Sequence, residues 1–236
     1  MQLFYNPDIT PTSLEVSFSK DESRHITKVL RKNDGDLLHL TNGKGFYFDA
    51  LLVSTNPKQC IAKIRKHEKQ SPLPYSLHLA VAPTKLNDRF EWFLEKATEI
   101  GVTEITPIIC DHSERRIIKK ERYEKIVQSA MKQSLKAYLP KLNAAVPFKE
   151  FIASDLKEDI KLIAHCEDTN KSSLNETIVK NKSVIILIGP EGDFSNEEIN
   201  TSISYGFSAI SLGNSRLRTE TAAIVACHSV NFIANN

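Results

Sequence analysis

The sequence predicts an α/β domain with a mainly parallel sheet, preceded by a small β-rich barrel. Residues before position 70 read mostly as strands, whereas the later part alternates short apolar runs with helical stretches. A charged stretch with two prolines, Lys66 to Ser76, lies between these parts and has the composition of a linker. We therefore expect a β-barrel domain over residues 1–70 and an α/β domain over residues 75–236.

The amino-terminal part carries the signals of strands, turns and one helix. Ser19 and Glu22 have the spacing of a capping box and predict a helix start. The pair Asn42-Gly43 is typical of a hairpin turn. Alternating or apolar segments predict strands at 14–18, 37–40, 46–53 and 60–64.

The second part has the rhythm of strands that alternate with helices. Helices are expected over 87–101, 119–139 and 219–235, and the pair Ser195 and Glu198 predicts a second capping box. Apolar runs of the length of buried strands lie at Leu77–Ala82, Ile105–Cys110, Ile160–His165, Val184–Ile188 and Phe207–Leu212. This order is typical of an α/β domain.

Composition excludes some classes of protein. The four cysteines form no C-x-x-C pair, which favours reduced thiols and a cytoplasmic protein. The first residues show no signal peptide, and the longest apolar run, Val184 to Ile188, is too short to cross a bilayer. The net charge of +2 neither demands nor excludes a nucleic-acid partner.

Two glycine loops near the carboxyl terminus are the most informative segments. They read IGPEGDFS at 188–195 and LGNSRLRTET at 212–221, and each follows an apolar run and opens a helix. We expect one ligand pocket at the carboxyl ends of adjacent parallel strands, where the glycines let backbone groups approach the ligand. Neither loop matches a dinucleotide-binding or a phosphate-binding glycine motif, so a nicotinamide or a nucleoside triphosphate is not supported.

Two arginines stand at the start of the last helix, where the helix dipole disfavours cations. An anionic substrate is the functional explanation for Arg218. For Arg216 two explanations are equally open. The side chain binds an anionic substrate, or it has no ligand and either lies in solvent or pairs with Glu191 or Glu220.

Basic residues cluster in three places, which favours a stripe that binds RNA phosphates over ordinary solvated faces. The expected RNA contacts are Arg24, Lys28, Arg31, Arg115, Arg116, Lys132 and Lys136. No metal is expected, because His165-Cys166 and Cys227-His228 lack further ligands at the usual spacing.

Taken together, these segments resemble the ribosomal RNA small subunit methyltransferase E family along nearly the whole chain. The matching segments are His25 with Val29-Leu30-Arg31, Gly35-Asp36, Lys85, Lys96–Gly101, Ile105–Pro107, Ser113–Arg115, Gln133-Ser134, Gly189–Gly192 and Leu212-Gly213 with Leu217–Ala222. The sequence departs from the family at Asp193, where a second glycine is usual, and at Ser215-Arg216, where Arg-Ile is common. It also departs at Lys132 and Lys136, where Glu and Arg are frequent.

The resemblance implies a SPOUT-class enzyme that methylates uridine N3 in 16S rRNA with S-adenosylmethionine. It further implies a trefoil knot formed by the two glycine loops, a PUA-like RNA-binding barrel and a homodimer acting on 16S rRNA or the small ribosomal subunit. The positions that would hold the donor are Ile188, Gly189, Pro190, Glu191, Gly192, Leu212, Gly213, Leu217 and Thr219.

Two residues are candidates for the chemical step. Uracil N3 is a poor nucleophile until its proton leaves, so a fixed cation near the developing negative charge would help. Arg218 is the candidate for this role or for binding the adjacent phosphate. Glu191 is the candidate for the base that removes the N3 proton, or it only contacts the sulfonium of the donor. The alternatives are a SPOUT methyltransferase for another RNA position and a non-catalytic RNA-binding protein.

Overall fold

The computed structural model describes residues 2–167 and 170–235. The chain forms two compact units, the first made of Met1–Pro72 and Met131–Leu139 and the second of Leu73–Ala130 and Pro140–Asn236. The sequence pattern did not predict that Met131–Leu139 would join the first unit. In the described part of the chain, no helix has both the length and the apolar character needed to span a bilayer.

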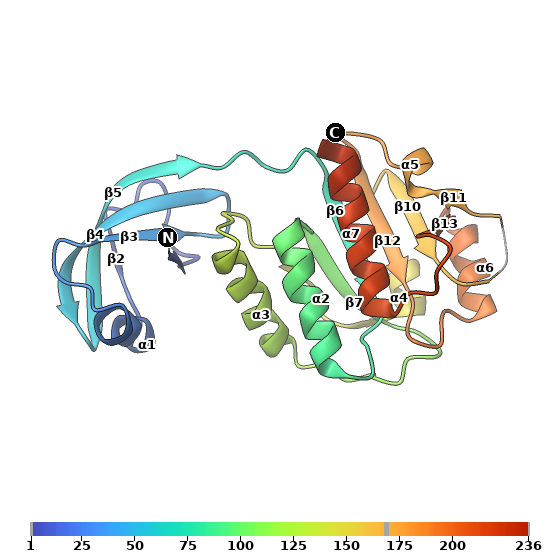
Figure 1. Cartoon of the computed structure of the whole chain (residues 1–236), viewed down its shortest axis with the longest axis horizontal. Helices are drawn as coiled ribbons and strands as arrows, with labels where there is room; N and C mark the ends of the chain where they lie inside the picture. The colour runs from blue at the N-terminus through green and yellow to red at the C-terminus, as the bar shows by residue number, and fades with distance from the viewer. Residues whose placement is uncertain (1, 168–169, 236) are drawn as a thin grey trace. The chain divides into compact units, whose positions relative to one another are not determined.

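The first unit is built on one five-stranded sheet that curls on itself (Figure 1). Its order is β1-β3-β4-β5-β2, with β1 parallel to β3 and the other pairs antiparallel. Phe4 in β1 packs edge-on against Phe18, which follows β2, with 5.7 Å between the ring centroids. The two edge strands therefore approach each other across the core. The strands are β1 (Leu3–Tyr5), β2 (Glu15–Ser17), β3 (Leu37–Thr41), β4 (Phe46–Asn56) and β5 (Gln59–Lys69).

The predicted helix of the first unit has two parts. Ser19 accepts a hydrogen bond from the backbone of Glu22, as the capping pattern predicted, and opens α1 (Lys20–Arg24). The chain continues as a π-helix, η1 (His25–Val29), which places Ile26 in the core of this unit. A left-handed residue, Arg31 with φ 54°, lies shortly after the π-helix.

The segment Met131–Leu139 binds the sheet of the first unit through its backbone. The Tyr47 hydroxyl donates to the Leu135 carbonyl at 2.6 Å, and the amide of Gly45 donates to the Ala137 carbonyl at 2.8 Å. For the helix expected over 119–139, the predicted carboxyl-terminal end is therefore wrong. The helix is α3 (Lys120–Gln133), and the chain then turns through Leu135, whose φ is 53°.

The second unit is an α/β domain with an eight-stranded sheet, which confirms the predicted fold class. The order is β11-β13-β10-β12-β6-β7-β8 with β9 beside β7, and every pairing is parallel. The strands are β6 (Ser76–Val81), β7 (Glu104–Ile109), β8 (Lys141–Leu142), β9 (Val146–Pro147), β10 (Ile160–Ala164), β11 (Ser172–Ser173), β12 (Ser183–Ile188) and β13 (Ser208–Ser211).

Helices cover both faces of this sheet (Figure 1). On one face, α2 (Asn87–Ile100) packs against α7 (Thr219–Asn235), and α7 also contacts β6 and β12. On the other face, α4 (Phe148–Ile152) and α6 (Asn196–Ser204) pack together. The short helix α5 (Leu174–Thr177) contacts α7.

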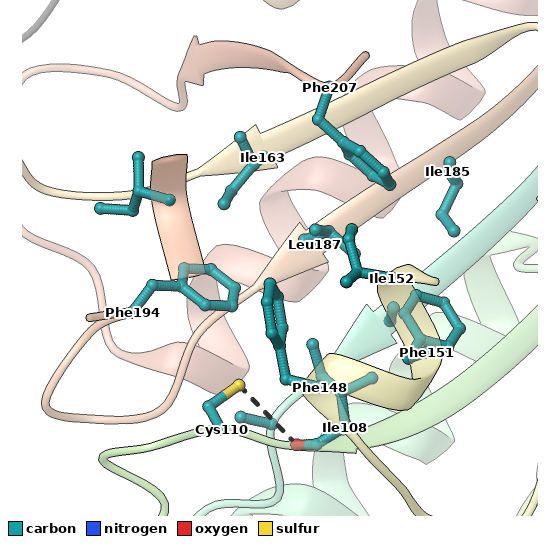
Figure 2. Close-up of a cluster of buried hydrophobic side chains, with 13 residues drawn as sticks. Ile108, Cys110, Phe148, Phe151, Ile152, Ile163, Ile185, Leu187, Phe194 and Phe207 are labelled. Carbon is teal, nitrogen blue, oxygen red and sulfur yellow. Dashed lines mark hydrogen bonds between the residues drawn. The ribbon is translucent and has the colours of Figure 1, made fainter. Parts of the chain in front are cut away.

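The core under α4 and α6 is rich in phenylalanine. Figure 2 shows Phe148, Phe194 and Phe207 gathered over the sheet residues Ile163 and Leu187. Phe194 comes from the first glycine loop, so this loop is anchored in the core at its carboxyl end.

The two glycine loops do not follow adjacent strands, so that prediction is wrong. They follow β12 and β13, and β10 lies between these strands, with Ala164 in register with both Ile188 and Ile210. The loop after β10 is therefore placed between the two glycine loops.

The starts of β10 and β12 are tied together by one carboxylate. Asp159 accepts hydrogen bonds from the Ser183 amide at 2.9 Å, the Ser183 hydroxyl at 2.8 Å and the Lys182 ammonium at 3.2 Å. The bonds from Ser183, followed by the bond from Lys182, lower the pKa of Asp159 to about 2.

We predict that Asp159→Asn removes an acid-sensitive part of the stability. An unfolded aspartate has a pKa of about 3.9, whereas the folded value is about 2. The carboxylate therefore stabilises the fold fully above the unfolded pKa, and this contribution is lost as the pH falls through the folded pKa. Urea unfolding at several pH values should show a constant wild-type advantage near neutrality that shrinks in acid. An advantage independent of pH would contradict the assignment.

Candidate functional site

Two joined hollows lie at the carboxyl ends of β10, β12 and β13. The small hollow, of about 270 Å³, is lined by Ile188, Gly189, Pro190, Glu191, Arg218 and Thr219. The large hollow, of about 570 Å³, is lined by His165, Glu167, Lys171, Gly192 and residues 210–215. Six residues line both hollows: Ala164, Cys166, Asp193, Arg216, Leu217 and Ala222.

The structure brings the predicted donor-binding residues together. All of them line one or both hollows, although they come from two loops on either side of β10. The two candidates for the chemical step, Glu191 and Arg218, both line the small hollow. In the described part of the chain, no acidic side chain lies within 4 Å of the Arg216 or Arg218 guanidinium. The pairing with Glu191 or Glu220 considered for Arg216 is therefore not formed.

The third wall of the site, the loop after β10, was missed by the sequence analysis. Cys166 and Glu167 line the large hollow, and so does Lys171, whose ammonium donates to the His165 carbonyl at 2.8 Å. These residues carry no motif. Only the strand order, which puts β10 between β12 and β13, could have pointed to them.

The glycines of the first loop lie in tight surroundings. A Cβ on Gly189 would lie 3.0 Å from the Phe194 ring, and one on Gly192 would lie 3.0 Å from the Cβ of His112. The turn closes through a hydrogen bond of 2.9 Å from the Asp193 amide to the Pro190 carbonyl. Asp193 itself is left-handed, with φ 63°, a conformation that aspartate tolerates better than most residues.

Carboxylates of this loop and of α6 accept hydrogen bonds from the backbone of neighbouring loops. Glu191 accepts from the Lys85 amide after β6, at 2.9 Å. The Glu198 carboxylate, whose residue is only 2% exposed, accepts from the Asp111 amide after β7, also at 2.9 Å. Ser195 and Glu198 form the predicted capping box, which is therefore confirmed.

The start of α7 is fixed to the first glycine loop. The hydroxyl of Thr219 donates to the Gly189 carbonyl at 3.0 Å, and both groups are buried. This bond holds the chain that carries Arg216 and Arg218 against the end of β12. Glu220, the next residue, is also buried, and its Oε1 lies 3.8 Å from the Nε of Arg89.

The predicted RNA contacts fall into two groups. Arg24, Lys28, Arg31, Lys132 and Lys136 belong to the first unit, where Arg24 and Lys28 line a surface hollow with Lys20, His25 and Lys58. Arg115 and Arg116 belong to the second unit and already have partners in the backbone.

The guanidinium of Arg115 donates to the carbonyls of Thr84 and Lys85, and that of Arg116 donates to the carbonyl of Asp111. These two arginines therefore stabilise the loops after β6 and β7, whatever they also bind. Within the described ranges, no three His, Cys, Asp or Glu side chains are placed to hold a metal ion.

We predict that Thr219→Val destabilises the second unit without changing side-chain volume. The Gly189 carbonyl would stay buried without its donor, at a cost of about 1 to 3 kcal/mol in the free energy of unfolding. Chemical denaturation measures this loss. Thr201→Val, at a half-buried position of α6, is the control and should change stability by less than about 0.5 kcal/mol. Equal stability of Thr219→Val and wild type would contradict the role given to this hydrogen bond.

Comparison with protein families agrees with this architecture. Residues 71–231 match a family described as RNA methyltransferase domain, and residues 18–65 match one described as RNA methyltransferase PUA domain. The fold and these matches define the class, an RNA methyltransferase domain with an amino-terminal PUA-like domain.

A curated relative specifies the family further. The ribosomal RNA small subunit methyltransferase E of Buchnera aphidicola is 35% identical over 89% of this chain and 85% of its own length. The chain belongs to the ribosomal RNA small subunit methyltransferase E family.

Solved structures show the same fold over the full length. A protein from Porphyromonas gingivalis described as a probable rRNA methyltransferase has a TM-score of 0.92 at 43% identity, covering 100% of this chain and 99% of its own. The ribosomal RNA small subunit methyltransferase E of Neisseria gonorrhoeae, solved bound to S-adenosyl methionine, has a TM-score of 0.87 at 28% identity. That match covers 99% of this chain and 98% of the other.

Proposed function

We propose that this protein transfers a methyl group from S-adenosylmethionine to N3 of a uridine in 16S rRNA. One observation carries the proposal. The loops after β10, β12 and β13 and the start of α7 converge on two joined hollows, in a chain of this family. The relative from Neisseria gonorrhoeae was solved bound to the same donor.

The residues around the hollows fit such a donor. A volume of about 570 Å³ is in the range of small-molecule sites, and Ile210, Leu212 and Leu217 offer apolar contacts to a nucleoside. Both ring nitrogens of His165 are buried with no hydrogen-bond partner among the described residues. Burial, followed by the nearby Lys171, lowers the pKa of this imidazole, so it is neutral near pH 7 and can pair with a polar ligand group.

The small hollow holds the groups suited to the acceptor. When bound, S-adenosylmethionine supplies an activated methyl group. Arg218, whose guanidinium has no acidic partner within the described ranges, offers its charge to the negative charge that develops on the uracil as its N3 proton leaves, or to the adjacent phosphate. Glu191 keeps one oxygen on the Lys85 amide. Its carboxylate is thereby aimed at the same hollow, as the base or as a contact for a cation.

We assign the RNA contacts to the basic residues of both units. Arg24, Lys28, Arg31, Lys132 and Lys136 would bind phosphates from the first unit and set the register of the RNA. Arg115 and Arg116 would add contacts from the second unit beyond those with their backbone partners. The free cysteines and an rRNA substrate support a cytoplasmic location.

We also propose a trefoil knot and a homodimer. Two observations support the knot: β10 lies between β12 and β13, and the chain after β13 returns to the end of β12 at Thr219. Small residues of α7 do not support a contact between subunits, because Ala223, Ala226 and Ala234 are buried within the chain itself. Phe232, which is 59% exposed on α7, is the better candidate.

The product distinguishes this function from its rivals. Purified protein, S-adenosylmethionine and small ribosomal subunits that lack the modification should yield 3-methyluridine in 16S rRNA, measured by mass spectrometry of nucleosides. Methylation at another position would support a different RNA methyltransferase. Binding of RNA with no donor binding and no product would support a non-catalytic binder.

We predict that Arg218→Ala lowers methyl transfer by about 100-fold, the scale of one lost electrostatic contact to a transition state. Donor affinity by calorimetry and the melting temperature should stay close to wild type, because the guanidinium has no acidic partner among the described residues. Arg218→Lys, which keeps the charge, should recover part of the rate. Wild-type turnover of Arg218→Ala, or its failure to fold, would contradict the assigned role.

A further inference from the structure

Asp193 joins two loops of the site through its carboxylate. Oδ2 accepts a hydrogen bond of 2.6 Å from the Cys166 amide in the loop after β10, and Oδ1 accepts one of 2.8 Å from the Phe194 amide. The left-handed backbone of Asp193 places this side chain at the rim shared by both hollows. Two backbone donors hold the carboxylate in a fixed position.

The charges around the two hollows balance only if Asp193 is included. The small hollow has Glu191 and Asp193 against Arg216 and Arg218. The large hollow has Glu167 and Asp193 against Lys171 and Arg216. Each hollow is therefore lined by two carboxylates and two cationic side chains. Without Asp193, each lining would carry one excess positive charge.

The field of Asp193 acts at the junction of the hollows. Burial raises the pKa of the Cys166 thiol, Asp193 raises it further, and Arg216 opposes the shift. Cys166 lines both hollows, so the carboxylate and the Arg216 guanidinium act on the same small region.

We propose that Asp193 is a specificity-determining residue, whose carboxylate makes the site prefer the positively charged sulfonium donor to the neutral thioether product. This inference rests on the proposed function, because it takes S-adenosylmethionine as the donor. Donor and product differ by one methyl group and one positive charge at sulfur. With the sulfonium at the junction of the two hollows, beside Asp193, a fixed carboxylate stabilises the donor complex more than the product complex.

Calorimetry with S-adenosylmethionine and S-adenosylhomocysteine tests the proposal on the full-length protein. Asp193→Asn keeps a residue that tolerates the left-handed backbone and keeps one carbonyl acceptor. We expect it to bind the product within about twofold of wild type and the donor about fivefold more weakly. Glu197→Gln removes an equal charge from the exposed first turn of α6, outside both hollows, and should leave both affinities unchanged.

Asp193→Gly gives a second measurement. Glycine adopts the left-handed backbone conformation without strain, so this variant removes the whole side chain and leaves the backbone conformation accessible. It should lose the same preference and also bind both ligands more weakly, since the loop that contains Cys166 is no longer tied. The preference of wild type for the donor over the product should fall with added salt, and that of Asp193→Asn should not.

If wild type binds both ligands and neither variant changes their affinity ratio, the inference is wrong and the proposed function stands. If wild type binds neither ligand, the proposed function itself is contradicted and the inference falls with it.

Discussion

The site depends on one repeated interaction, a carboxylate on the β12–α6 segment that accepts a backbone N–H from a neighbouring loop. Glu191 binds the Lys85 amide after β6, Asp193 binds the Cys166 amide after β10, and Glu198 binds the Asp111 amide after β7. Hydrogen bonds to charged acceptors are stronger than those between neutral groups. Three strand-end loops are therefore held against a fourth by a few residues of a single segment.

In the part of the chain that the structure describes, this arrangement leaves Arg216 and Arg218 without an acidic partner. The two acids considered as partners for Arg216 have other contacts, because Glu191 accepts a hydrogen bond from the Lys85 amide and Glu220 lies 3.8 Å from Arg89. The acids thus shape the hollow, while the guanidinium groups are left for a ligand. A cation at the small hollow can stabilise the negative charge that develops on the uridine as its N3 proton leaves.

Local signals in the sequence predicted local structure. The capping pair Ser195 and Glu198 opened α6 as expected, and the apolar runs became the long parallel strands. The glycine loops also identified where the hollows lie. In the first unit, the capping pattern at Ser19 marked the helix start, but no rule indicated that the helix would continue as a π-helix.

What the sequence did not reveal depends on contacts between distant residues. Because β10 lies between β12 and β13, Cys166 and Lys171 in the loop after β10 line the site. The sequence of that loop contains no motif that predicts this position. The expected helix ends at Gln133, and the carbonyls of Leu135 and Ala137 beyond it accept hydrogen bonds from Tyr47 and Gly45, which are far away in the sequence. Asp193 was noted as a departure from the family, but its bond to Cys166 required the fold.

A crystal structure of this protein with S-adenosylmethionine would test the central claim most directly. The account predicts that the donor lies in the two joined hollows, against the loops that contain Cys166, Gly189 and Gly213. The hydrogen bonds of Glu191, Asp193 and Glu198 to neighbouring loops should be retained. A donor bound elsewhere, or a site in which these three carboxylates have released their backbone partners, would contradict it.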